Sequence, residues 1–165
     1  SARVVLCKGI VTDPGYLLFY TNYESRKGRE LDAHPRAAAV LFWDAWHRQL
    51  RVEGPVVKSP APESDAYFES RARDRRIGAW ASQQSRPVES RAALRAAVEQ
   101  VNARYPGEQV PRPPHWGGYR LWAESVELWG EGAARIHDRA RWTRTLERSG
   151  EGFTAGAWSA TRLQP

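Results

Sequence analysis

Apolar and polar positions follow the spacing of strands at both ends of the chain and that of helices in its middle. In the first third, short runs rich in β-branched and aromatic residues predict strands at residues 3–8, 16–21, 37–43 and 49–58. A turn sequence at residues 12–15 makes the first two strands a predicted hairpin. Residues 25–33 predict a helix that Ser25 caps and that His34-Pro35 ends. Gly54 inside the last strand predicts a bulge or the close approach of another backbone.

The middle third has helical spacing. Pro62-Glu63-Ser64-Asp65 predicts a helix start, because proline suits the first turn and acidic residues suit the positive end of the helix dipole. A second helix is predicted after Ser90, where apolar residues from Leu94 to Tyr105 recur at positions i, i+3, i+4, i+7 and i+11. Pro106-Gly107 ends this helix, and residues 111–114 form a stiff connector.

The last third returns to strands, predicted at residues 118–122, 126–129, 134–142 and 157–163. Between the last two, the glycine-rich residues 146–156 predict a mobile hairpin tip. No internal repeat or domain boundary is visible. We therefore predict a single, mainly β (α+β) domain over residues 1–165, with an antiparallel barrel or sheet whose edge is covered by helices.

Composition narrows the class of protein. With 165 residues, 41% hydrophobic and 27% charged, the chain suits one folded domain, and no apolar run approaches the ~20 residues of a membrane span. Cys7 is the only cysteine, which fits a reducing, cytoplasmic location, and its place in an apolar run predicts a small buried thiol rather than a nucleophile. The chain starts at Ser1 and contains no methionine, so we expect that an upstream segment was cleaved, disordered or left out.

The net charge of +6 raises the possibility of a polyanionic partner. Only three of the 25 basic residues are lysines, Lys8, Lys27 and Lys58; the others are arginines. A genome rich in arginine codons explains this bias as simply as a role of arginine in binding carboxylates or phosphates does. Acidic residues lie between the arginines along the whole chain, which argues against nucleic-acid binding. There is no glycine-rich dinucleotide loop and no P-loop, and the four histidines lack metal-ligand spacing, so no metal site is predicted.

Cations gather among hydrogen-bonding residues at several places. On a continuous strand, Arg135, His137 and Arg139 would project from one face, where they repel one another unless an anion or acidic partners offset them. Arg26 and Lys27 follow Ser25 at a helix start, an arrangement suited to phosphate. A solvated strand face and an ordinary polar first turn are the simpler interpretations. Residues 71–76 hold four further arginines.

Six segments, taken in order, resemble the pyridoxamine 5′-phosphate oxidase family: residues 3–8, 19–30, 48–54, 77–85, 114–120 and 126–139. The resemblance covers nearly the whole chain. It implies an FMN-binding split barrel, which is an antiparallel Greek-key barrel with flanking helices. It further implies a homodimer with FMN at the subunit interface, no nucleic-acid or membrane partner, and small-molecule substrates, namely a phosphorylated B6 vitamer and O2.

The resemblance also assigns residues. It implies FMN contacts for Arg3, Val4, Val5, Leu6, Cys7, Lys8, Tyr20, Thr21, Arg26, Lys27, Gln49, Gln84, Ser85, Trp129 and Arg139. Substrate contacts are implied for Lys8, Tyr67, Arg71, Arg135 and His137, and Arg75 is added because it stands where the family usually has a serine. These types suit the roles, since phosphates bind arginine and lysine, and a flavin ring edge needs amide donors such as Gln49.

The implied reaction is the oxidation of pyridoxamine or pyridoxine 5′-phosphate to pyridoxal 5′-phosphate. A hydride passes from the substrate to flavin, and O2 is reduced to H2O2. We expect Arg135 and His137 to be the catalytic pair; for His137, proton removal and substrate orientation alone remain alternatives. Arg75 keeps open a related flavin oxidase acting on another aromatic substrate, as in the phenazine pathway. A non-catalytic flavin-binding or nucleic-acid-binding module is the third alternative.

Three further departures from the family pattern are visible, and the first of them, at Leu128, is expected to affect packing. Leu128 stands where an aromatic residue is usual, and the segment 146–156 is longer than expected. The family's stretch before Arg3, with a first strand and a substrate lid, is not in this chain. Without that stretch we expect the barrel to lack a strand and activity to be lower.

Overall fold

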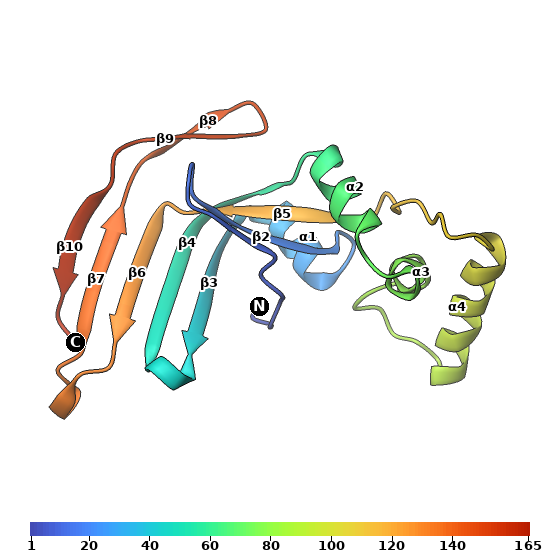
Figure 1. Cartoon of the computed structure of the whole chain (residues 1–165), viewed down its shortest axis with the longest axis horizontal. Helices are drawn as coiled ribbons and strands as arrows, with labels where there is room; N and C mark the ends of the chain where they lie inside the picture. The colour runs from blue at the N-terminus through green and yellow to red at the C-terminus, as the bar shows by residue number, and fades with distance from the viewer. The chain divides into compact units, whose positions relative to one another are not determined.

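The computed structural model covers residues 1–165 and is built mainly of antiparallel strands with four α-helices (Figure 1). The strands are β1 (Gly9–Val11), β2 (Tyr16–Asn22), β3 (Arg36–Trp43), β4 (Arg48–Lys58), β5 (Trp116–Trp122), β6 (Ser125–Gly130), β7 (Asp138–Thr143), β8 (Leu146–Ser149), β9 (Gly152–Ala155) and β10 (Ser159–Leu163). The helices are α1 (Arg26–Ala33), α2 (Ala61–Glu69), α3 (Arg73–Ala81) and α4 (Arg91–Arg104), with short 3-10 turns η1 (Asp44–Trp46) and η2 (Ala133–Arg135).

The strands form one large sheet and one hairpin. The large sheet has the order β1-β2-β5-β4-β6-β7-β10, and β3 also pairs with β4; β8 and β9 pair with each other. Two compact units share these elements: unit 1 contains residues 1–6, 19–34 and 58–119, and unit 2 contains residues 7–18, 35–57 and 120–165. No helix in the structure is long and apolar enough to cross a membrane.

Unit 1 holds the four helices around aromatic residues. Phe68 and Ile77 are almost fully buried, and Trp116 packs edge-on against Phe68 with ring centroids 5.1 Å apart. Ser25 caps α1 by accepting a hydrogen bond from the Gly28 amide, as the sequence predicts. Gly28 lies so close to the backbone of Tyr23 that a Cβ would stand 1.8 Å from its carbonyl oxygen. This close approach fixes the position of α1.

Unit 2 contains the strands β3, β4, β6, β7 and β10, which lie side by side (Figure 1). Its buried residues include Val52, Val56 and Trp122. In the register of these strands, Gln49 on β4 faces Trp129 on β6, which faces Arg139 on β7. Because side chains alternate across a strand, these three residues project from the face opposite to that of Val52.

Most predicted elements are confirmed, including the helices after Ser25, Pro60 and Ser90 and six of the eight predicted strands, with ends shifted by up to two residues. Gly54 makes the close approach expected of it, since a Cβ there would lie 2.0 Å from the carbonyl oxygen of Trp122. Helix α3 was not predicted, because residues 71–76 appear in the sequence as a run of charge. Residues 146–156 form the strands β8 and β9, so the predicted hairpin is confirmed.

The prediction of a strand at residues 3–8 is wrong. The first strand begins at Gly9, and Val4 and Leu6 are 97% and 71% exposed. No neighbouring strand pairs with residues 3–7, so the apolar pattern has nothing to pack against. Cys7 is also exposed, and its thiol lies 3.3 Å from the carbonyl oxygen of Gly9. The expectation of a buried thiol is therefore wrong too.

The prediction of a continuous strand from residue 134 to 142 is also wrong. Ala134 and Arg135 have left-handed backbones, with φ of 53° and 65°, and form the turn η2. Strand β7 begins only at Asp138. Arg135, His137 and Arg139 therefore do not alternate along one strand, and the repulsion expected between them on a shared face does not arise.

Candidate functional site

The Lys27 cluster lies in unit 1 and consists of Thr21, Ser25, Lys27 and Gln84. The ammonium group of Lys27 donates to the Thr21 hydroxyl at 2.7 Å, to the Ser25 hydroxyl at 3.2 Å and to Oε1 of Gln84 at 2.7 Å. Thr21 and Ser25 are buried, and burial together with nearby Arg3 lowers the pKa of Lys27. These three bonds use the three donors of the ammonium group, so an anion that binds Lys27 at the start of helix α1 takes the place of one of these acceptors.

Arg3 and Arg26 meet at the carboxylate of Glu30. Arg3 donates to Oε2 of Glu30 and Arg26 to Oε1, each at 3.0 Å. The hydrogen bond from the Ser1 hydroxyl, together with these two contacts, holds the pKa of Glu30 down at about 2. Both arginines were predicted as FMN contacts, whereas Glu30 was not singled out. The pairs are exposed, so the two guanidinium groups retain donors for another anion.

Tyr20, Tyr67 and Trp116 form an aromatic stack in unit 1. The rings of Tyr20 and Tyr67 are 3.9 Å apart and nearly parallel, and Trp116 stacks on both at 5.6 and 6.1 Å. The guanidinium group of Arg71 lies 4.7 Å over the ring of Trp116. The structure therefore brings together Tyr67 and Arg71, both predicted as substrate contacts, and adds Trp116, which the sequence did not single out.

Arg71 carries an unused hydrogen-bond donor. Its Nη1 atom is buried and has no hydrogen-bond partner, and burial lowers the pKa of the guanidinium group. A buried guanidinium donor without an acceptor is costly unless an anion satisfies it. Arg75, by contrast, is exposed near the start of α3. Its charge acts on Arg71, where it adds to the lowering of the pKa.

Gln49, Trp129 and Arg139 are three neighbours on one sheet face in unit 2. All three were predicted as flavin contacts, and the register of β4, β6 and β7 places them in one row. Arg139 donates from Nε and Nη2 to Oε1 of Glu127, at 3.0 and 2.9 Å. Glu127 was not predicted. Glu127 lies two residues before Trp129 on β6, so both side chains project from the same face of the sheet. This spacing is the feature of the sequence from which Glu127 could have been predicted.

His137 and Arg135 lie in the turn between β6 and β7. The imidazole Nδ1 of His137 accepts a hydrogen bond from the Gly132 amide at 3.2 Å, and its ring is 4.7 Å from that of Trp129. Since Nδ1 is an acceptor, the ring proton is on Nε2. Arg135 is exposed and has the left-handed backbone noted above. The turn therefore joins the predicted catalytic pair to the predicted flavin residues of unit 2.

The remaining predicted residues lie outside the clusters of Lys27, Arg71 and Arg139. Ser85 is exposed and has a left-handed backbone with φ of 71°. Val4, Val5 and Leu6 are exposed in unit 1, whereas Cys7 and Lys8 belong to unit 2. The amide of Lys8 donates to the carbonyl oxygen of Leu18 at 2.7 Å, which leads into strand β1.

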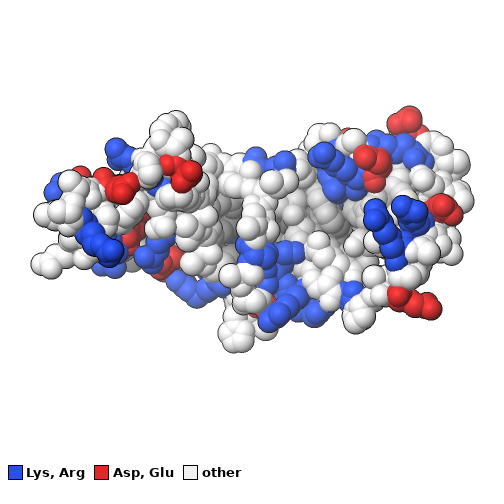
Figure 2. Space-filling model, turned by 90° about the horizontal axis from the view of Figure 1, so that it is seen from below, with Lys and Arg blue, Asp and Glu red and all other residues white.

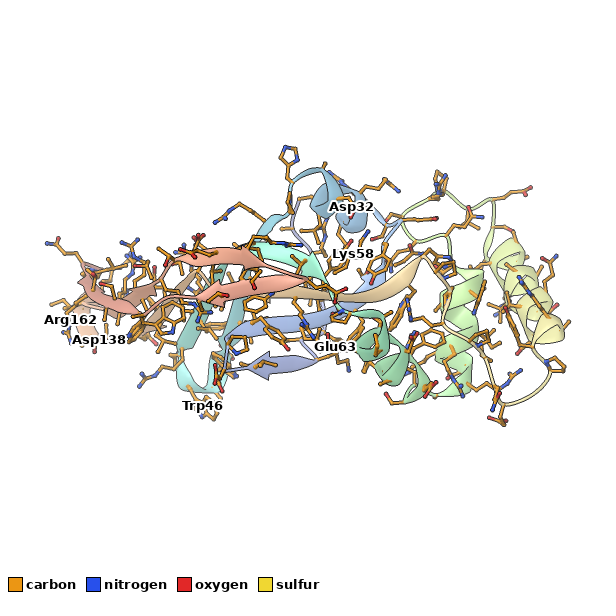
Figure 3. All side chains as sticks on the ribbon, turned by 90° about the horizontal axis from the view of Figure 1, so that it is seen from above. Asp32, Trp46, Lys58, Glu63, Asp138 and Arg162 are labelled. Atoms are coloured by element: carbon orange, nitrogen blue, oxygen red, sulfur yellow. The ribbon has the colours of Figure 1, made fainter.

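Elsewhere in the molecule, basic side chains form ion pairs with acidic ones. Figure 3 labels two of them, Lys58 with Asp32 at 3.1 Å in unit 1 and Arg162 with Asp138 at 3.5 Å in unit 2. On the face drawn in Figure 2, lysine and arginine occur in several groups with acidic residues near them. A cavity of about 560 Å³ in unit 1 is lined by Tyr23, Asp32, Lys58 and His115, among others, and contains none of the predicted site residues.

The residues present fit a phosphorylated flavin. The Lys27 cluster offers a cation with hydroxyl and amide groups for a phosphate, and Gln49 offers an amide for a ring edge. Arg71 supplies a buried donor that lacks an acceptor, in a separate cluster suited to a second anion.

Two family models match the chain and together cover most of it. Residues 1–105 match the family model described as pyridoxamine 5′-phosphate oxidase, and residues 116–165 match the pyridoxine 5′-phosphate oxidase C-terminal dimerisation region. The curated pyridoxine/pyridoxamine 5′-phosphate oxidases of Burkholderia lata and Paraburkholderia phytofirmans are each 50% identical over all of this chain and 73% of their own length.

Solved structures give the fold. PhzG from Burkholderia lata, in complex with tetrahydrophenazine-1-carboxylic acid, is 33% identical with a TM-score of 0.83, over 100% of this chain and 75% of that one. A pyridoxamine 5′-phosphate oxidase-related FMN-binding protein from Nostoc punctiforme, 16% identical, has a TM-score of 0.70 over 99% of this chain and 80% of that one. The predicted split-barrel fold class is confirmed. From the two family models and the 50% identity over its whole length, the chain belongs to the pyridoxine/pyridoxamine 5′-phosphate oxidase family.

Proposed function

We propose that the chain is an FMN-dependent oxidase that converts pyridoxamine or pyridoxine 5′-phosphate to pyridoxal 5′-phosphate and uses O2 as electron acceptor. The observation that carries the proposal is the presence in unit 1 of two separate groups suited to one phosphate each. The Lys27 cluster is one, and Arg71 with its unsatisfied Nη1 beside Tyr67 is the other. A phosphorylated cofactor and a phosphorylated substrate need two such groups.

Lys27, Thr21 and Gln84 would hold the FMN phosphate, with Arg3 and Arg26 adding charge. Gln49, Trp129 and Arg139 would contact the ring. When bound, FMN supplies the hydride acceptor and the reaction with O2. The protein's own contribution is to exclude water and to hold the substrate carbon and its amine or hydroxyl group in position.

Arg71 and Tyr67 would bind the substrate phosphate, together with Lys8. Arg135 and His137 would act at the other end of the substrate. The Nε2 atom of His137 carries a proton when Nδ1 accepts from Gly132, so this atom can donate to the substrate's oxygen or nitrogen. Arg135 would place its charge against the pyridine ring substituents.

A homodimer is part of the proposal. Strand β3 leaves Val40 and Phe42 exposed by 60% and 56%, and Trp46 in the adjoining turn η1 points away from the strands (Figure 3). Apolar exposure on this scale is typical of a surface that another chain covers. The match of residues 116–165 to a dimerisation region supports the same arrangement. FMN at the interface between two copies, and a cytoplasmic location, complete the proposal.

A turnover assay tests the function. Purified protein should be yellow and release H2O2 on addition of pyridoxamine 5′-phosphate or pyridoxine 5′-phosphate with O2. A flavin spectrum without turnover of either vitamer would contradict the proposed substrate. Absence of flavin binding at any tested concentration would contradict the cofactor as well.

A second function has one specific observation in its favour. PhzG, the 33% identical structural relative, is described in complex with tetrahydrophenazine-1-carboxylic acid, and Arg75 adds a guanidinium near Arg71. An extra cation suits a carboxylated aromatic substrate as well as a phosphorylated one. Turnover of tetrahydrophenazine-1-carboxylic acid in place of the B6 vitamers would favour this function. Replacing Arg75 by serine should then reduce that turnover.

A further inference from the structure

We propose that Glu127 is a positioning residue that holds Arg139 in the orientation needed to bind the flavin; the inference rests on the proposed FMN-binding function. Glu127 itself would not touch the flavin. It lies on β6 two residues before Trp129 and on the same sheet face. At 6% exposure it is the one acidic residue among the buried polar side chains.

The close hydrogen bonds of Glu127 come from Arg139. In the strand register Glu127 faces Arg51 on β4 and Arg141 on β7. Its carboxylate nevertheless accepts two close hydrogen bonds from Arg139, which lies diagonally across the strands, two residues before Arg141 on β7. It contacts Arg51 only at 3.5 Å. Both bonds from Arg139 end on one oxygen, Oε1, and because two donors, Nε and Nη2, converge on it, the direction of the guanidinium group is restricted.

A third contact completes the restraint on Arg139. Its Nη1 atom donates to the backbone carbonyl oxygen of Gln164 at 3.0 Å. Three of the five N–H donors of a guanidinium group are then in use, and the remaining two are left for a ligand. Arg139 is only partly exposed, which limits its freedom further. The side chain is thus held in place before any ligand binds, and a held group loses less entropy on binding.

The two neighbouring arginines explain why a carboxylate is needed at this buried position. Burying a charge is costly unless it is paired and hydrogen-bonded, and Glu127 has an arginine on either side. An amide in its place has one oxygen for Arg139 but lacks the negative charge that strengthens both of these bonds, and it turns an NH2 group toward Arg51. Glu127→Gln therefore keeps the size of the side chain but cannot satisfy both arginines.

The experiment measures FMN affinity rather than activity. Protein stripped of flavin is titrated with FMN, and quenching of flavin fluorescence gives Kd for the unmodified chain, Glu127→Gln and the matched control Glu53→Gln. Glu53 lies on the same face and pairs with Arg51, but it does not contact Arg139. We expect Kd to rise about tenfold in Glu127→Gln, the loss of a charged hydrogen bond, and less than twofold in the control.

A double-variant comparison separates positioning from a general effect on the sheet. If Glu127 acts through Arg139, Glu127→Gln should change Kd less than twofold when Arg139→Gln is already present. The neutral double variant also leaves no uncompensated carboxylate, which protects folding; circular dichroism checks it. The inference is overturned if Glu127→Gln raises Kd for FMN as much in the Arg139→Gln variant as in the unmodified chain. It is also overturned if Glu127→Gln alone leaves Kd unchanged. In both cases the unmodified chain still binds FMN, so the proposed function is unaffected. No FMN binding by the unmodified chain overturns the proposed function and the inference with it.

Discussion

His137 and Trp129 are in ring contact, with centroids 4.7 Å apart and planes inclined by 44°. Trp129 belongs to the regular strand β6, whereas His137 precedes β7 in the turn that the left-handed residues Ala134 and Arg135 create. The contact and the hydrogen bond from Gly132 hold the imidazole in one orientation. A side chain in a turn is thereby restrained by two contacts, which suits a role at the reacting part of a substrate.

Two amide replacements of His137 separate its possible roles. Asn can place an acceptor near the position of Nδ1, and Gln can place an amide near that of Nε2. Neither amide accepts a proton at neutral pH, so proton removal by His137 predicts that kcat falls about a hundredfold in both variants. Steady-state kinetics with bound flavin quantified in each sample provide the measurement. Near-normal kcat in His137→Gln would show that His137 only orients the substrate.

Replacement of Arg135 should affect turnover but not the cofactor. Arg135 is exposed in the turn η2 and has no assigned flavin contact. Arg135→Ala should therefore abolish turnover while flavin stays bound, as measured by absorbance after gel filtration. A glycine at this left-handed position serves as a control for backbone strain, because glycine adopts positive φ without cost. Loss of flavin from either variant would mean that Arg135 acts on the cofactor instead.

Arg71 should determine the affinity for the substrate phosphate. Arg71→Lys keeps the charge but loses the planar group that stacks on Trp116 and the fork that binds two phosphate oxygens. We expect KM for the phosphorylated vitamer to rise at least about tenfold with a smaller change in kcat, since the contact is remote from the reacting carbon. Arg104→Lys, which stacks on Trp80 in the same unit, is the matched control. Equal effects in both variants would point to folding and not to phosphate binding.

FMN affinity should decrease as the solution becomes alkaline. Burial, with nearby Arg3, lowers the pKa of Lys27 from its ordinary 10.5, so the unfolded chain binds more protons than the folded one between the two pKa values. The free energy of unfolding therefore gains a contribution from Lys27 as pH rises through that window, while the charge available to a phosphate is lost. Titrations at increasing pH should show Kd for FMN rising before pH 10.5. Lys27→Arg should remove this dependence, because arginine stays charged; an identical pH profile in that variant would contradict the role.

Two helical glycines should respond to alanine in opposite ways. A Cβ at Gly28 would lie 1.8 Å from the carbonyl oxygen of Tyr23, whereas a Cβ at Gly78 would meet nothing within 4 Å. Gly28→Ala must move α1 away from the backbone and should cost about 1–3 kcal/mol or more of the free energy of unfolding. Gly78→Ala should stabilise α3 by about 0.5–1 kcal/mol, since alanine restricts the unfolded chain. Thermal unfolding followed by circular dichroism measures both; a stable Gly28→Ala protein would show that the contact yields easily.

Local signals account for the parts of the fold that the sequence predicts. Ser25 and Ser90 each cap a helix through a hydrogen bond within three residues, and proline and glycine end elements through their own backbones. Such signals depend little on the rest of the chain. The strand predicted at residues 3–8 fails because a strand needs a partner, and apolar residues alone do not provide one. The left-handed turn at Ala134 and Arg135 fails for a related reason, since neither residue type favours that backbone by itself.

The amino-acid sequence by itself determined the helix caps, most of the strands and, through six ordered segments, the family and the residues expected to bind two phosphates. Only the tertiary structure showed that Lys27 is held by Thr21 and Gln84, that a donor of Arg71 is buried without an acceptor, and that Glu127 holds Arg139. These features join residues that are far apart in the chain or diagonal across strands. Burial and orientation of that kind arise from strand register and packing, which no single stretch of sequence encodes.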